Sequence, residues 1–356
     1  MWKTTPGSTA HLVQLCGAYF FFYVLTGVTV KYYQGAPPQP GMNGMQFLAY
    51  STLGGTVLCL GVAVSFGWWR LHSNQPMKVL GLTLPGELKY IVPSGICTAV
   101  VIPTTTLMYS LKGISVMVAM VIMRGAVIVI SRSVDAIQIK QGILKKKVFW
   151  QEDAAVGFAI AAVGVTALFA GETKGSSIIE SPAALTILAC YVTAYFIRIF
   201  IMNFYKNTRA PGVKQDNKGF FALEQIAASV TLALTTVAML AVSSQTEQIV
   251  TFQAAVKEPH SLWFWAAALG GGSFGAVAFF SVFIFMFQGR TATFAGLVNR
   301  LTSLMAGTAA TLISFAMFGG KLPKIEEWLS LGLILVAVGF LTVAERRRSA
   351  ELAVAK

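Results

Sequence analysis

Residues 112–124 read KGISVMVAMVIMR, and residues 288–300 read QGRTATFAGLVNR. Aligned without a gap, the two stretches match at four positions, which pair Gly113 with Gly289, Ser115 with Thr291, Ala119 with Ala295 and Arg124 with Arg300. A second pair follows, because EDAAVGFAIAAVG at 152–164 falls on the end of EEWLSLGLILVAVG at 326–339. Two neighbouring segments repeat together, which predicts a chain built from two similar halves.

The composition places these segments in a lipid bilayer. The chain has 356 residues, of which 55% are hydrophobic and 12% charged, and its mean hydropathy is +0.68. A soluble domain carries about 25% charged residues, so the sequence predicts a polytopic membrane protein. The net charge of +13 would suggest nucleic acid as a partner in a soluble protein; here we expect it to face anionic lipid headgroups and expect no nucleic acid partner.

Apolar runs of about 20 residues predict the spans. Ten are found, at 11–30, 46–68, 90–110, 115–131, 154–170, 182–204, 219–243, 262–287, 291–317 and 328–345. The fold class predicted is therefore an all-α polytopic membrane protein with ten transmembrane helices. Residues 1–173 form the first five-helix repeat, and residues 174–356 form the second with a basic tail. An odd number of spans per repeat inverts the second half relative to the first, as in many secondary transporters.

The distribution of basic residues predicts the orientation. Eighteen of the 27 lysines and arginines fall on the side of the two termini, six on the opposite side and three within spans. Basic residues in short loops are retained in the cytoplasm, so both termini are predicted to be cytoplasmic. The absence of an Asn-x-Ser/Thr sequon fits a multi-pass protein of a bacterial inner membrane, and an organelle membrane stays open.

Three arginines interrupt the apolar runs. Arg124 and Arg300 each lie nine residues into their spans, about 14 Å at 1.5 Å per residue, so they approach mid-membrane from opposite faces. Arg198 is a third intramembrane cation, against a single acid near a span interior, Glu224. A surplus of positive charge remains that carbonyls, water or a bound anion must satisfy. Arg124 and Arg300 are thus candidate substrate-binding residues, with internal packing or salt bridges as the alternative.

Other polar side chains in the spans complete the candidate set. Tyr195 and Asn299 are candidate ligand contacts, and so is Thr104, which follows Pro103 in IPTTT and equally suits a helix kink. The three histidines and four cysteines are scattered without metal-ligand spacing. We therefore expect no metal site, no cofactor, no catalytic residue and no enzymatic activity.

The chain resembles the drug/metabolite transporter superfamily. The residues that carry this resemblance are MRGAVIVIS at 123–131 and Gly-x(4)-Ala-Val-Gly, which begins at Gly157 and again at Gly332. The closer similarity is to the nucleotide-sugar and triose-phosphate transporter-like (EamA-like) branch. The resemblance implies that Arg124 and Arg300 hold an anionic group between the halves. GLVNRLTS at 296–303 lacks the lysine-containing signatures of nucleotide-sugar and sugar-phosphate carriers, so it does not specify a nucleotide sugar.

Three functions remain open from the sequence. The first hypothesis is a secondary transporter that moves a small anionic metabolite, phosphorylated or carboxylated, by alternating access. The second is a proton-coupled exporter of amphipathic or cationic compounds, with Glu224 as the proton site. The third is a membrane scaffold that transports nothing. A homodimer is compatible with each.

Overall fold

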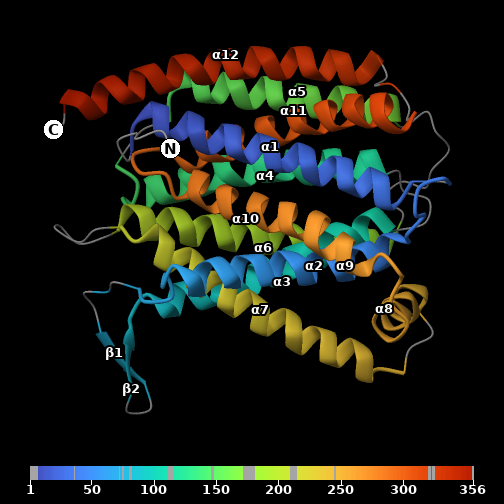
Figure 1. Cartoon of the computed structure of the whole chain (residues 1–356). Coiled ribbons are helices and arrows are strands. Elements are labelled where there is room, and N and C mark those ends of the chain that lie inside the picture. Colours follow the sequence, from blue (N-terminus) through green and yellow to red (C-terminus); the bar gives the residue numbers. More distant parts are fainter. Residues whose placement is uncertain are drawn as a thin grey trace.

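The computed structural model describes residues 7–35, 37–71, 73, 76–79, 82–110, 116–145, 148–170, 181–208, 215–243, 246–319, 322 and 325–354. Most of them are helical (Figure 1). The helices are α1 (Thr9–Tyr33), α2 (Gly44–Ser65), α3 (Leu88–Ser110), α4 (Val116–Lys140), α5 (Trp150–Ala170), α6 (Pro182–Asn207), α7 (Asn217–Ala241), α8 (Glu247–Lys257), α9 (Trp263–Trp265), the π-helix η2 (Ala266–Gly271), α10 (Gly272–Phe285), α11 (Ala292–Phe318) and α12 (Ile325–Val354).

Eight helical segments among the described residues are long and apolar enough to cross a membrane. They are α1, α2, the first 18 residues of α3, α6, α7, the continuous segment α9–η2–α10, α11 and most of α12. This confirms the prediction of a mainly helical, multi-pass membrane protein with lipid as its surroundings. The predicted spans 115–131 and 154–170 fall in α4 and α5, which are also helical but are not among these eight.

Two elements were not predicted. Strands β1 (Pro76–Val79) and β2 (Leu82–Pro85) pair antiparallel in the connection between α2 and α3, with Met77 opposite Leu84. Helix α8 lies between α7 and α9. Both are too short to span a bilayer, so they do not change the class of the protein.

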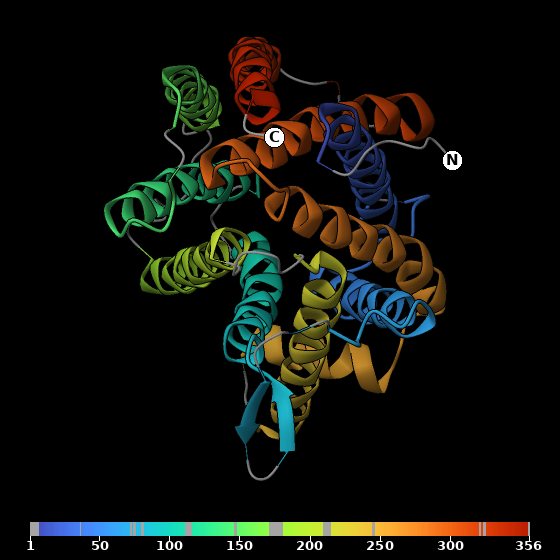
Figure 2. The same cartoon turned by 90° about the vertical axis from the view of Figure 1, so that its left-hand side faces the viewer.

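The long helices run side by side (Figure 1), and Figure 2 views them end-on. Helices α5 and α12 pack together at one edge of the bundle, and α3 and α7 pack together toward the opposite edge. Between them, α1 packs on α10 and α11, and α4 packs on α6 and α11. Helix α1 begins and α12 ends at the same end of the bundle, which we call the N/C end; α8 lies at the opposite end.

Local sequence explains where the central helices begin and how closely they approach. Thr291 caps α11, because its hydroxyl accepts a hydrogen bond from the backbone N–H of Phe294 at 3.1 Å. Gly319, with φ of +67°, ends α11 in a left-handed conformation. A Cβ at Gly296 would collide with the Ser131 hydroxyl, so this glycine lets α4 lie directly against α11. The contact of α4 with α11 positions the residues described next.

Candidate functional site

Arg124 of α4 and Arg300 of α11 are both buried, each with 7% of its surface exposed. A Cβ built on Gly307 of α11 would lie 3.8 Å from Nη1 of Arg124. Gly307 follows Arg300 by about two helical turns, and residues at this spacing share one face of a helix. The structure therefore places the guanidinium of Arg124 on the face of α11 that carries Arg300, roughly 10 Å along the axis from the Cα of Arg300.

Each arginine lies over a tyrosine ring. Arg124 donates from Nη2 to the Tyr23 hydroxyl at 3.4 Å, and its Cζ lies 5.7 Å from the centre of that ring. The Cζ of Arg300 lies 5.0 Å from the centre of the Tyr195 ring. Both distances are typical of cation–π contacts. Tyr195 was predicted from the sequence as a ligand contact, whereas Tyr23 was not.

A second tyrosine accompanies each of these rings one turn earlier. The Tyr19 and Tyr23 rings of α1 are 5.5 Å apart, and the Tyr191 and Tyr195 rings of α6 are 4.7 Å apart. The signal was present in the sequence as a repeated Tyr-x(3)-Tyr, in YFFFY at 19–23 and YVTAY at 191–195. We call Arg124 with Tyr23, and Arg300 with Tyr195, the two arginine–tyrosine pairs.

Tyr19 and Asn299 connect the two pairs. Tyr19 is 2% exposed and interacts electrostatically with both arginines. Its hydroxyl donates to Oδ1 of Asn299 at 3.3 Å, and Nδ2 of Asn299 donates to the Ser281 hydroxyl of α10 at 2.9 Å. The predicted Asn299 thus lies beside the arginines, where its amide is already engaged with protein groups.

Within the described part of the chain, no carboxylate neutralises the charge of the two arginines. Among the described residues, neither Arg124 nor Arg300 forms an ion pair with a carboxylate, and the buried Nε of Arg300 has no hydrogen-bond partner. A cation–π contact contributes only about 0.5–2 kcal/mol, less than the cost of burying a charge. An anion between the arginines would satisfy both the charge and the open donor.

Arg198, the third predicted arginine, has a different environment. Its Nε and Nη2 donate to the two carboxylate oxygens of Glu224 at 2.9 and 3.2 Å. Glu224 is completely buried and also accepts hydrogen bonds from the hydroxyls of Ser94 at 2.6 Å and Thr98 at 3.3 Å. This network ties α3, α6 and α7 together, and it compensates the charge of Arg198 within the protein.

Thr104 also uses its hydroxyl within the protein. It is 8% exposed and donates to the carbonyls of Val100 at 2.7 Å and Val101 at 3.1 Å in its own helix. Pro103 removes a backbone donor at this place, so the hydroxyl supports the helix around it. The hydroxyl is thus engaged within its own helix, and the ligand contact of Thr104 stays a prediction.

A buried polar network at the N/C end joins sequence-distant helices. Asp135, near the end of α4, is completely buried and accepts the backbone N–H groups of Ala292 at 2.9 Å and Thr293 at 2.6 Å. These are unsatisfied donors of the first turn of α11, where the helix dipole also favours a negative charge. Asn203 of α6 donates to the same carboxylate at 3.2 Å.

The network continues through α5 and α12. Glu152 of α5 accepts from the Thr291 hydroxyl at 2.6 Å and lies 3.5 Å from Nη2 of Arg348. Arg290, just before α11, forms a two-pronged ion pair with Glu345 of α12. We call the contacts of Asp135, Glu152 and Arg290 the polar lock. None of these polar contacts was predicted from the sequence.

No group of three or more metal-ligating side chains occurs in the described ranges. The arginine, tyrosine and amide groups of the candidate site can bind and orient an anion.

No family model matches the chain, and no curated protein matches it. The chain is similar to a solved structure described as "Crystal structure of protein", with a TM-score of 0.58 and 13% sequence identity over 96% of this chain and 99% of that one. At this identity the similarity shows a shared fold and nothing of activity. Membership of the drug/metabolite transporter superfamily therefore stays a prediction from the sequence motifs.

Proposed function

We propose that the chain is a secondary transporter that moves a small anionic metabolite by alternating access. The observation that carries this proposal is the pair of buried arginines, Arg124 and Arg300, which lie over tyrosine rings and have no carboxylate partner in the described part of the chain. Buried charges inside a membrane are costly and mark substrate pathways in transporters. A phosphate or carboxylate of the substrate would supply the missing negative charge.

The helix contacts support the proposed inverted repeat of ten spans. Helix α1 packs on α10 and α11, and α6 packs on α3 and α4. Helix α2 packs on α10 as α7 packs on α3, and α4 packs on α5 as α11 packs on α12. When α1, α2, α3, α4 and α5 are exchanged, in that order, with α6, α7, the α9–α10 segment, α11 and α12, each of the contacts just named becomes its counterpart in the other half. The two arginine–tyrosine pairs are exchanged as well, so each half would contribute one pair.

The spacing of the arginines bears on the size of the substrate. The guanidinium of Arg124 reaches α11 at Gly307, about two turns and roughly 10 Å along the axis from the Cα of Arg300. A small anion that contacts both arginines would lie between their two side chains, which would bend toward it. A longer anion would extend along α11. The tyrosine rings would line this path and contact the uncharged part of the substrate.

The polar lock bears on the alternating-access step. It joins α4, α5, α11 and α12 at the N/C end, so in the proposed cycle this state would admit the substrate from the opposite end. Opening the N/C end would require the backbone N–H groups of Ala292 and Thr293 to leave Asp135. Water entering the opened end would then hydrate the separated groups, which lowers the cost of the change.

The geometry supports an anion better than the cationic substrate of the alternative hypothesis. A cation would be repelled by Arg124 and Arg300, and Glu224 is engaged by Arg198, Ser94 and Thr98. Protonation of Glu224 would weaken its ion pair with Arg198 and leave the buried guanidinium without a counter-charge, which is costly.

A ligand screen tests the proposed function. The purified protein would be heated with a panel of organic phosphates, carboxylates, uncharged analogues and organic cations. A ligand present at 100 times its Kd stabilises the native state by about 2.7 kcal/mol, so a bound anion should raise the melting temperature by several degrees. Stabilisation by cations alone, with none by the anions, would contradict an anion carrier and favour the exporter.

Cysteine labelling tests the predicted topology. In a chain without its four native cysteines, Lys145→Cys and Ala350→Cys at the N/C end should react with a membrane-impermeant maleimide only after the cells are opened. Glu258→Cys, after α8, is the matched control at the opposite end and should react in intact cells. All three positions are exposed. Labelling of Lys145→Cys or Ala350→Cys from outside would reverse the proposed orientation.

A further inference from the structure

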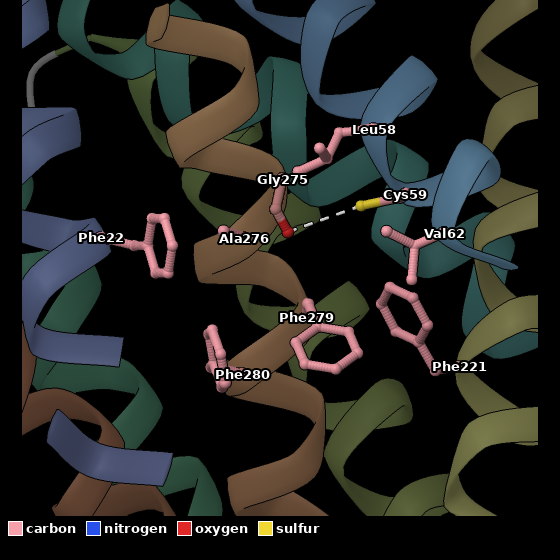
Figure 3. Close-up of a pocket in the computed structure, with 9 residues that line it drawn as sticks. All are labelled: Phe22, Leu58, Cys59, Val62, Phe221, Gly275, Ala276, Phe279 and Phe280. Atoms are coloured by element: carbon pink, nitrogen blue, oxygen red, sulfur yellow. Dashed lines mark hydrogen bonds between the residues drawn. The ribbon is translucent and has the colours of Figure 1, made fainter. Parts of the chain in front are cut away.

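An apolar cavity of about 180 Å³ lies between α1, α2, α7 and α10, away from the arginines (Figure 3). Gly275 and Phe279 of α10 form its base, and Phe22 of α1 and Leu58 of α2 lie on either side. Its lining exposes no polar surface. The one carbonyl drawn at its edge, that of Gly275, accepts a hydrogen bond from the Cys59 thiol at 3.5 Å.

The cavity lies in the part of the bundle toward the N/C end. Val62, which lines it, is in the last turn of α2, and Phe221 is in the first two turns of α7. Leu58, which lines the cavity, is 38% exposed, so the wall at α2 also forms part of the outer surface of the bundle. In a membrane protein that surface faces the hydrocarbon of the bilayer, and acyl chains are abundant molecules that fit a lining without polar groups.

Aromatic and basic side chains lie next to the cavity, on the side of the membrane surface. The Phe279 ring stacks on Trp68, with ring centres 5.7 Å apart. Nζ of Lys218 lies 5.3 Å from the centre of the Trp68 ring, and Cζ of Arg70 lies 5.0 Å from the centre of the Trp69 ring. Both cationic residues are exposed. Tryptophan with lysine or arginine at a helix end is typical of the level of the lipid headgroups.

We infer that this cavity binds an anionic phospholipid, with one acyl chain between α1 and α2 and the phosphate at Lys218 and Arg70. Charge complementarity favours an anionic over a zwitterionic headgroup, because the rim carries two cations. Asp216, which accepts the backbone N–H of Gly219 at 2.9 Å and caps α7, adds one negative charge, so Lys218 and Arg70 together leave the rim with a net positive charge. The inference depends on the membrane location of the chain and does not depend on what it transports.

Native mass spectrometry of the full-length protein tests this site. The probes are phosphatidylglycerol and phosphatidylcholine with identical palmitoyl and oleoyl chains. The wild-type chain should retain phosphatidylglycerol about tenfold better than phosphatidylcholine. The double variant Lys218→Gln/Arg70→Gln should lose this preference. Lys89→Gln/Lys140→Gln removes two exposed cations at the same end outside the cavity and should keep it.

A second variant tests the acyl-chain position separately from the headgroup. Leu58→Trp fills the mouth of the cavity from an exposed position and should lower retention of both lipids severalfold, while the melting temperature in detergent stays near that of the wild type. If this variant does not fold, Val62→Phe tests the same wall of the cavity. Equal retention of the two lipids by the wild type would overturn the inference. Undiminished retention by the folded, filled variant, or loss of preference in the control pair, would overturn it as well.

Discussion

Replacing Arg198 with alanine should lower the free energy of unfolding by about 3–5 kcal/mol, the range found when one partner of a buried ion pair is removed. Glu224 is completely buried and receives two of its four hydrogen bonds from Arg198. Without the guanidinium, the carboxylate would remain in a site that water cannot easily reach, or it would have to bind a proton. Denaturant titration in detergent micelles measures the change.

Two further variants make this prediction specific. Arg198→Met/Glu224→Leu removes both charges together and should recover most of the loss, because apolar replacement of a whole buried pair is often close to neutral. Arg132→Ala breaks an exposed ion pair with Asp153, of 2.6 Å, and should cost no more than about 1 kcal/mol. If Arg198→Ala folds with wild-type stability, the Arg198–Glu224 pair does not stabilise the fold. That result would favour the alternative hypothesis, in which Glu224 is a proton site.

Helix positions could be predicted from the sequence, but their ends could not. The run 46–68 corresponds to α2, Gly44–Ser65, because length and hydropathy mark the part of a helix inside a bilayer. Helix α4 continues nine residues beyond the predicted end at 131, to Lys140, and α12 continues to Val354. A helix can continue beyond the bilayer into water, where its backbone hydrogen bonds still form, so hydropathy does not mark where a helix ends. The β1–β2 hairpin was missed because strands this short depend on their pairing.

The candidate site was predicted in part, for reasons that follow from its chemistry. Arg124 and Arg300 were found because a charge in an apolar run is conspicuous. Tyr19 and Tyr23 were missed because a tyrosine in such a run is equally typical of packing. Asp135 was missed because its partners are backbone N–H groups 157 and 158 residues away, which leave no mark in the local sequence.

Arg124→Ala and Arg300→Ala should each weaken binding of the anion identified by the ligand screen by more than about 1.5 kcal/mol, or over tenfold. Both variants should remain folded without ligand. Arg300→Ala removes contacts with Tyr195, Tyr191 and Tyr19, and removal of a buried charge that has no carboxylate partner among the described residues can raise stability. Affinity and the melting temperature without ligand are measured together, for each variant and for the double variant.

Lysine replacements at the same positions separate the contribution of positive charge to anion binding from that of the guanidinium geometry. Arg124→Lys and Arg300→Lys keep the positive charge but cannot donate two parallel hydrogen bonds to one anion, so they should restore only part of the affinity. Arg132→Ala, which removes a guanidinium from the exposed surface, is the matched control and should bind as the wild type does. A structural role for the arginines predicts the opposite pattern, in which the alanine variants melt at lower temperature without ligand. Normal folding with unchanged affinity in both alanine variants would exclude the two arginines from the binding site, and the proposed anion carrier would lose the observation on which it depends.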